Sequence, residues 1–341
     1  MTTCRVAVAR YVWSTAAPPV IPQLQWPDTF YEALFNGRNG WSLHDFWLRS
    51  TFGWIDLQFD IRPWRTLRRE KTEVVNNRGA ILDACRSQAR DDGEPIEGYD
   101  AMIAFMHAPP CAAGALRRDV VLDQHASLAY YEHEVGHAIG FEHSFGPAGP
   151  YDDPYCVMGK TDSPTSAAAQ PGMGGPANTG YDIPVPAEFN GVTFTNPPFW
   201  RMDRMLSAAA LYRYVPEFAQ SQSVVHVDLP RGGARVSLTG LTHGHGGHGT
   251  LLAVAHHPTG DFTVEYRPRF LDDQSMRPAV VVHSVGRRAP DPKLHHEDRP
   301  VYFEAAVEPV TSTTRVVDHD LQVEITDSTD REAGVYLTPP S

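Results

Sequence analysis

Apolar residues recur with two different periods in the first half of the chain. Short apolar or alternating runs, which are typical of strands, separate segments whose apolar residues follow helical spacing. This alternation predicts an α/β (α+β) layer with a mixed sheet. The strands are expected at 4–13, 55–61, 101–106 and 119–124, and the helices at 42–51, 71–91, 128–139 and 201–215.

The pattern changes from about residue 222, where short alternating segments are separated by Gly, Pro and Asp turns. That pattern favours an all-β, sandwich-like domain. A length of 341 residues also favours two domains, which we expect at 1–220 and 221–341. Between the two patterns, residues 144–198 are rich in Gly, Pro, Ser and Asn, and are expected to be mostly a site-shaping or mobile loop.

The net charge and the hydropathy of the chain argue against certain partners and against insertion into a membrane. The net charge is −12 without a cluster of Lys and Arg, so nucleic acid and anionic membrane surfaces are not expected partners. No apolar run is long enough to span a bilayer, and the N-terminus alternates like a strand rather than a signal peptide. The chain is therefore expected to act inside the cell, to leave it without a leader, or to be a trimmed form. The oligomeric state is not indicated.

The cysteines do not form a CxxC pair, so a thiolate zinc site is not expected. Their even number allows two disulfides in an oxidising compartment, but the same number is ordinary for buried reduced thiols. Both alternatives stay open for the four residues Cys4, Cys85, Cys111 and Cys156.

The segment HEVGHAIGFEH, which begins at His133, matches the pattern HExxHxxGxxH. On a helix, His133 and His137 lie on one face and can bind one metal, with Glu134 beside the metal-bound water. Gly140 can take a positive φ and return His143 as the third ligand. Three imidazoles leave a fourth position open, as a catalytic Zn²⁺ site requires. The pattern arises by chance in on the order of one chain in ten thousand or fewer.

The extended motif resembles that of the metzincin zinc peptidases, which share a methionine-containing turn beneath the metal. YCVMG, with Met158, is similar to that turn, and YDDP at 151–154 resembles the lead-in of bacterial immune-inhibitor-A-like and gametolysin-like peptidases. SLHDFWLRSTFGWIDL at 42–57 and VEYR at 264–267 are similar to segments of those families. The resemblance implies a metzincin-like catalytic domain in which Met158 supports the ligands by packing and is not itself a ligand.

Two features depart from that family. Lys160 stands where some metzincins have an additional tyrosine ligand, so Tyr155 or another loop tyrosine is a candidate oxyanion donor. The chain also begins almost directly with its first strand, so an inhibitory propeptide is not expected.

Other polar clusters have weaker interpretations. A histidine-rich, glycine-rich run could bind a second metal, although a mobile loop is the simpler interpretation. Its members are His243, His245 and His248, and the pairs His256–His257 and His295–His296 carry still less weight. Four acids could join a Ca²⁺ site, but they lack a spaced calcium-loop motif and are expected to be exposed. They are Asp152, Asp153, Asp272 and Asp273.

The function that these patterns favour is zinc-dependent hydrolysis of peptide bonds in a protein or peptide substrate, with Glu134 as general base. The substrate is expected to add as a strand to the edge of the sheet, at 101–106. One alternative is a metal-containing binding or adhesion protein that recognises its partner through the β domain. Another is an enzyme with one dedicated substrate. Serine hydrolase, P-loop and dinucleotide motifs are missing from the sequence.

Overall fold

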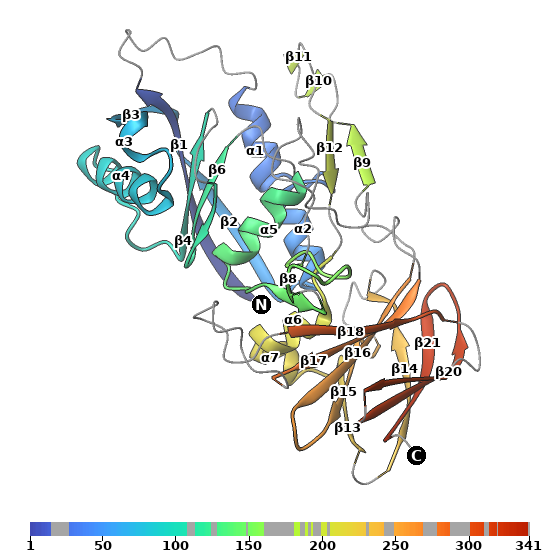
Figure 1. The fold of residues 1–341 in the computed structure, drawn as a ribbon. Coiled ribbons are helices and arrows are strands. Elements are labelled where there is room, and N and C mark those ends of the chain that lie inside the picture. Colours follow the sequence, from blue (N-terminus) through green and yellow to red (C-terminus); the bar gives the residue numbers. More distant parts are fainter. Residues whose placement is uncertain are drawn as a thin grey trace.

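The alternating N-terminal segment forms an internal strand of a mixed sheet in the computed structural model (Figure 1). The chain folds as a mixed α/β protein with several sheets and few helices, in line with the expected class. The structure describes residues 1–14, 27–107, 113–123, 128–147, 149–159, 181–184, 188–189, 192–193, 199–202, 205–229, 232–241, 249–268, 278–286, 301–309, 314–318 and 320–339.

The first sheet, which we call the upper sheet, has the order β2-β1-β4-β6-β5, with β3 paired to the far end of β1. Strands β2, β1, β4 and β6 are parallel, and β5 is antiparallel to β6 at one edge. The strands are β1 (Thr2–Ser14), β2 (Ile55–Ile61), β3 (Arg65–Glu70), β4 (Ala101–Met106), β5 (Gly114–Leu116) and β6 (Asp119–Asp123).

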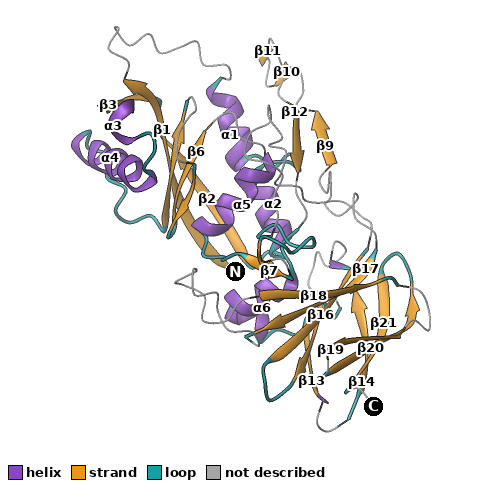
Figure 2. Cartoon of the chain, viewed as in Figure 1, coloured by secondary structure: helices purple, strands orange, loops and turns teal. Residues whose placement is uncertain are grey.

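Helices cover both faces of the upper sheet (Figure 2), which explains why its inner strands are apolar on both sides. Val6 and Val8 of β1 face the core formed with α1, α2 and α5, whereas Ala7 and Ala9 face α4. The bounds of these helices are α1 (Asp28–Asn36), α2 (Leu43–Ser50), α3 (Lys71–Val74), α4 (Arg78–Asp91) and α5 (Leu128–Ala138).

The prediction that residues 101–106 form the edge of the sheet is wrong. This segment is β4, which is buried throughout and pairs with β1 on one side and β6 on the other. A continuous apolar run marks a strand that is covered on both faces, and such strands lie inside a sheet. Within the described residues, the edge beyond β6 is the three-residue strand β5, which is too short to be recognised from its pattern.

The single helix expected at 71–91 is interrupted. Helix α3 ends at Val74, and α4 begins at Arg78 because the Asn77 side chain accepts a hydrogen bond from the N–H of Ala80 at 3.0 Å. An asparagine in this role is a strong helix N-cap, so it starts a new helix rather than continuing the old one.

The helix expected at 201–215 is shorter than its pattern suggested. Its first residues belong to β12 (Phe199–Met202), and α6 (Ala208–Tyr214) begins after the N-cap Ser207. The expected loop before it also contains short strands. These elements are β7 (Ser144–Gly146), β8 (Gly149–Pro150), β9 (Tyr181–Pro184), β10 (Glu188–Phe189) and β11 (Val192–Thr193), and α7 (Pro216–Ala219) follows α6.

The second half of the chain forms two sheets that enclose one apolar core. Side chains from both sheets meet there, among them Val236, Val264 and Val335, so this half is a β-sandwich. One sheet has the order β13-β15-β16-β17-β18-β7-β8 and the other β14-β21-β20-β19. The strands are β13 (Val224–Asp228), β14 (Ala234–Thr239), β15 (Leu252–His256), β16 (Asp261–Arg267), β17 (Ala279–Val285), β18 (Val301–Val307), β19 (Thr314–Asp318), β20 (Leu321–Ser328) and β21 (Glu332–Thr338).

The larger of these sheets also contains a segment from the first half of the chain. Strand β7 pairs in parallel with β18, with Ser144 opposite Val301 and Phe145 opposite Tyr302. This pairing crosses the domain boundary expected at residue 220, and that boundary itself stays a prediction.

The structure also bears on membrane insertion and on the state of the cysteines. The helices formed by the described residues are all too short or too polar to cross a membrane. Cys4, Cys85 and Cys156 are buried free thiols, and Cys111 lies outside the described residues. Burial raises the pKa of the Cys156 thiol to about 12, so this group stays protonated.

Candidate metal centre

Helix α5 carries two of the three histidines of the motif. His133 and His137 lie one turn apart and are buried together with the rest of the helix. The expected N-cap, Ser127, lies outside the described residues, and the helix begins at Leu128.

The helix ends where the sequence predicted, because Gly140 takes a φ of +98°. The N–H of Gly140 donates to the carbonyl of His137 at 3.0 Å, and the N–H of Phe141 donates to Gly136 at 2.9 Å. These bonds satisfy carbonyls at the end of the helix and reverse the chain. His143 therefore returns to the face of the helix that carries the other two histidines.

The three imidazoles converge on one point. One ring nitrogen from each of His133, His137 and His143 lies within 4.8 Å of the others, and the Nε2 atoms of His137 and His143 are 3.0 Å apart. Carbonyl groups of Val157 and Phe141 each lie 2.8 Å from Nδ1 of His133 and His137, respectively. A carbonyl oxygen can only accept a hydrogen bond, so the ring proton lies on Nδ1 in both residues. Nε2 then keeps its lone pair for a metal.

The surroundings of His137 and His143 favour the neutral form of these two imidazoles, which is the form that binds metal. Burial lowers the pKa of His137 to about 4, with a further contribution from the charge of His133. Burial, followed by His137 and His133, lowers the pKa of His143 still further. Neutral imidazoles bind metal ions, and these three histidines lie close enough together to hold one.

Glu134 lies beside these ligands and is itself buried. Burial raises the pKa of its carboxyl group. The charge of His137, a hydrogen bond from the Tyr130 hydroxyl, the charge of Arg78 and the N–H of Ala115 all oppose that rise. A raised pKa makes a carboxylate a stronger base, which suits it to accept a proton from water.

Met158, the methionine of the turn, packs directly against helix α5. A Cβ atom added to Gly136 would overlap the sulfur of Met158 and lie 2.9 Å from the Trp47 ring. Trp47, from α2, also stacks on Phe141 with ring centroids 5.5 Å apart. Gly136 is thus required for this packing, although the motif leaves its position unspecified and the sequence analysis missed it.

The tyrosine beside the histidines is not Tyr155. The Tyr155 ring stacks on Phe303 of the sandwich, with centroids 5.7 Å apart. The ring of Tyr151 instead lies 4.2 Å from His143 and 5.9 Å from His133, measured between centroids. Tyr151 has a φ of +66°, a left-handed conformation that is uncommon outside glycine and is often found at functional sites.

A fully buried polar network connects the metal centre to the sandwich. The carboxylate of Asp153 accepts from the Ser144 hydroxyl at 2.5 Å and lies 2.9 Å from Nε2 of His283 on β17. Ser144 directly follows His143, and its N–H donates to the carbonyl of Met158 at 2.9 Å. The third histidine and the methionine turn are therefore both attached to the sandwich.

The VEYR segment supplies the second part of this network. Arg267 donates to Glu265 at 2.8 Å, and both side chains are fully buried. Glu265 also accepts from the N–H of Ala208 at 2.6 Å. The guanidinium of Arg267 further donates to the carbonyls of Tyr155 and, at 3.2 Å, Leu206. The two charges of VEYR thus hold the methionine turn and the start of α6.

The ion pair between Asp153 and His283 makes stability depend on pH. Burial alone would lower the pKa of His283, but Asp153 and Glu265 outweigh both burial and Arg267, and raise it above 6.5. The protonated imidazole therefore contributes its full stability below pH 6.5, and this contribution is lost as the pH rises through the raised pKa. For Asp153, His283 and the hydrogen bonds outweigh burial and lower the pKa, so its contribution is lost only in acid.

We therefore expect the stability advantage of the natural chain over His283→Gln to be largest below pH 6.5 and to shrink as the pH rises above it. Urea unfolding of both proteins across this range measures it. Parallel stability profiles for the two proteins would contradict the assigned ion pair.

The weaker histidine and acid clusters have other partners or lie outside the described residues. Nδ1 of His226 is 2.8 Å from Nε2 of His256, a hydrogen-bond distance, and the planes of the two rings are nearly parallel. Asp153 is part of the buried network, so it is not the exposed acid that was expected. Nδ1 of His257 lies 2.8 Å from the Thr259 hydroxyl, and Asp152 is half-buried rather than exposed. The members that lie outside the described residues are His243, His245, His248, His295, His296, Asp272 and Asp273, and Lys160 lies outside them too.

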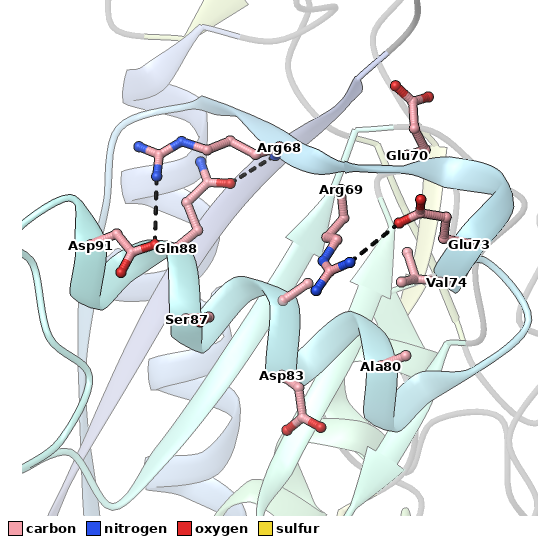
Figure 3. Close-up of a pocket in the computed structure, with 11 residues that line it drawn as sticks. Arg68, Arg69, Glu70, Glu73, Val74, Ala80, Asp83, Ser87, Gln88 and Asp91 are labelled. Atoms are coloured by element: carbon pink, nitrogen blue, oxygen red, sulfur yellow. Dashed lines mark hydrogen bonds and ion pairs between the residues drawn. The ribbon is translucent and has the colours of Figure 1, made fainter.

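A pocket of about 800 Å³ lies on the far side of the upper sheet, between β3 and α4. Figure 3 shows two ion pairs among its charged side chains, Arg69 with Glu73 and Arg68 with Asp91. It faces away from α5 and contributes nothing to the metal centre.

Comparison with known proteins does not add to this picture. No protein-family model matches the sequence, and no curated protein resembles it at a significant level.

Proposed function

We propose that the protein is a zinc-dependent metalloendopeptidase of the metzincin type. The observation that supports this most strongly is the convergence of His133, His137 and His143 within 4.8 Å, with Glu134 on the same helix. Met158, packed beneath α5, adds the feature that distinguishes a metzincin from other HExxH proteins.

In the proposed reaction, His133, His137 and His143 would hold a zinc ion through the ring nitrogens that converge. A bound zinc ion would lower the pKa of water and polarise the scissile carbonyl. The Glu134 carboxylate accepts the proton that the attacking water loses, and then donates it to the nitrogen of the leaving amine. The reaction thus needs no covalent intermediate on the protein.

The substrate strand is proposed to pair with β5, the strand at the edge of the upper sheet, because 101–106 lies inside the sheet. Strand β5 pairs with β6 on one side, and on the other the N–H of Ala115 bonds to Glu134. A peptide added to this edge would therefore lie beside the general base. Main-chain hydrogen bonds of this kind hold extended peptides with little dependence on sequence.

Tyr151 is the proposed donor to the oxyanion, because its ring lies against two of the ligands. Tyr151→Phe removes only the hydroxyl, so we expect kcat to fall by about 10²- to 10³-fold with an unchanged zinc content. Steady-state kinetics and metal analysis measure the two effects. Tyr155→Phe is the matched control and should keep kcat, and equal kcat values for both variants would remove Tyr151 from the mechanism.

The proposed function is tested by metal analysis of the purified chain together with digestion of a peptide library. We expect one zinc ion per chain, and cleavage of internal peptide bonds that stops on chelation and resumes when zinc is added. A chain that binds zinc but cleaves no member of the library would instead favour a binding or adhesion protein.

A further inference from the structure

The first residue of α4 reaches around the sheet to its edge strand. Arg78 follows the N-cap Asn77. One nitrogen of its guanidinium donates a hydrogen bond to the carbonyl of Ala115, and another donates to the carbonyl of Ala113. The side chain thus bridges the carbonyl of Ala115 in β5 and that of Ala113, the residue just before this strand.

Gly114 makes room for this bridge. It has a φ of +118°, and a Cβ atom added at this position would overlap the guanidinium of Arg78. The guanidinium therefore lies directly against the backbone of the edge strand, where a larger residue would exclude it.

The groups that Arg78 occupies are the ones that an added strand would need. In an extended strand the N–H and C=O of one residue point to the same edge, as do those of the residue two positions away. The N–H of Ala115 bonds to Glu134 on α5, so this edge is the one that faces α5. Arg78 bonds to the carbonyls of Ala113 and Ala115, and Glu134 bonds to the N–H of Ala115. These are the groups that an added strand would use.

We infer that Arg78 is a specificity-determining residue. A substrate strand replaces Arg78 as the hydrogen-bond partner of the two carbonyls, and the freed guanidinium then binds a carboxylate side chain of that substrate. This inference rests on the proposed function, because it requires the substrate to pair with β5. It names the substrate class as peptides with Asp or Glu close to the scissile bond.

A carboxylate is the partner that the chemistry favours. The guanidinium is half-buried, so the two hydrogen bonds that it loses must be replaced when a peptide covers it. Its planar fork binds a carboxylate through two parallel hydrogen bonds, which are stronger than those to neutral groups. Glu134 cannot be this partner during turnover, since its carboxylate must receive the proton of the attacking water.

The inference is tested with peptide pairs that are identical except for Glu or Gln at one position near the scissile bond. Zinc-loaded Glu134→Ala serves as a non-cleaving background in which affinities are measured by fluorescence anisotropy. We expect the Glu peptide to bind about tenfold more tightly at one position, and Arg78→Gln in the same background to abolish this preference.

Arg90→Gln is the matched control, because Arg90 lies on the same helix and forms an exposed ion pair with Glu97. It removes the same charge from α4 and should keep the preference. Arg78→Lys, which keeps the charge but not the fork, should retain only part of it.

An equal preference in Arg78→Gln and the control, or no preference at any position, would overturn the inference. A peptide preference that depends on Arg78, combined with no cleavage by the natural chain, would instead contradict the proposed function and leave the binding role of Arg78 supported. The two failures are therefore distinguishable.

Discussion

Glu134→Ala is expected to lower kcat by about 10²- to 10⁴-fold while the zinc content stays at one ion per chain. The carboxylate lies next to the ligands but is not one of them, so its removal takes away the proton acceptor and leaves all three imidazoles in place. Glu134 also accepts hydrogen bonds from Tyr130 and Ala115, and the alanine variant frees both donors near the edge strand. Steady-state cleavage of a peptide from the library, with metal analysis of the same sample, measures both quantities.

Glu142→Ala is the matched control for this prediction. Glu142 is a half-buried carboxylate in the same motif, adjacent to His143, and the mechanism gives it no proton to transfer. The control should therefore keep kcat within about twofold and retain zinc. Undiminished activity in Glu134→Ala would refute the assignment of the general base, whatever the zinc content.

Arg267→Met is expected to lower the free energy of unfolding by about 3–5 kcal/mol. The guanidinium is fully buried, and its loss leaves Glu265 as an uncompensated charge in the interior. The carbonyls of Tyr155 and Leu206 lose a donor in the same change. Urea unfolding followed by circular dichroism gives the difference in free energy.

The double variant Glu265→Gln/Arg267→Met distinguishes the cost of leaving the Glu265 charge unpaired from the cost of losing the contacts of the Arg267 side chain. The glutamine side chain would still accept from the N–H of Ala208 but would carry no buried charge, so most of the lost stability should return. A single variant that loses less than about 1 kcal/mol would show that the pair does not support the methionine turn.

The local part of the metal centre was accessible from the sequence because it depends on spacing along one helix. The interval from His133 to His137 places both rings on one face, and Gly140 supplies the positive φ that returns His143. These relations involve neighbours in the chain. Helical periodicity and the conformational freedom of glycine were enough to predict them.

The contacts that hold and surround the centre were not accessible, because they join residues far apart in the chain. Asp153 and His283 are separated by 130 positions, and Arg78 by 37 positions from Ala115. Nothing in the local pattern of either segment indicates its partner. The assignment of the sheet edge failed for a related reason, since the order of strands is a property of the whole sheet.

The packing beneath the centre illustrates a third limit. Gly136 occupies a position where the motif accepts any residue, yet the sulfur of Met158 and the ring of Trp47 leave no space for a side chain there. This requirement follows from where α2 and the methionine turn meet α5, and only the folded structure shows it.

The pairing of β7 with β18 has a consequence for how the proposed enzyme could be inactivated. The residue after His143 is the first residue of a strand whose partner comes from the last third of the chain. A cut that released β18 would leave Ser144 and Phe145 without that partner and take away the support of the third ligand. The core between the upper sheet and α4 is built from the first half of the chain alone, so we expect a protease acting on the sandwich to leave a metal-deficient remnant rather than a smaller active enzyme.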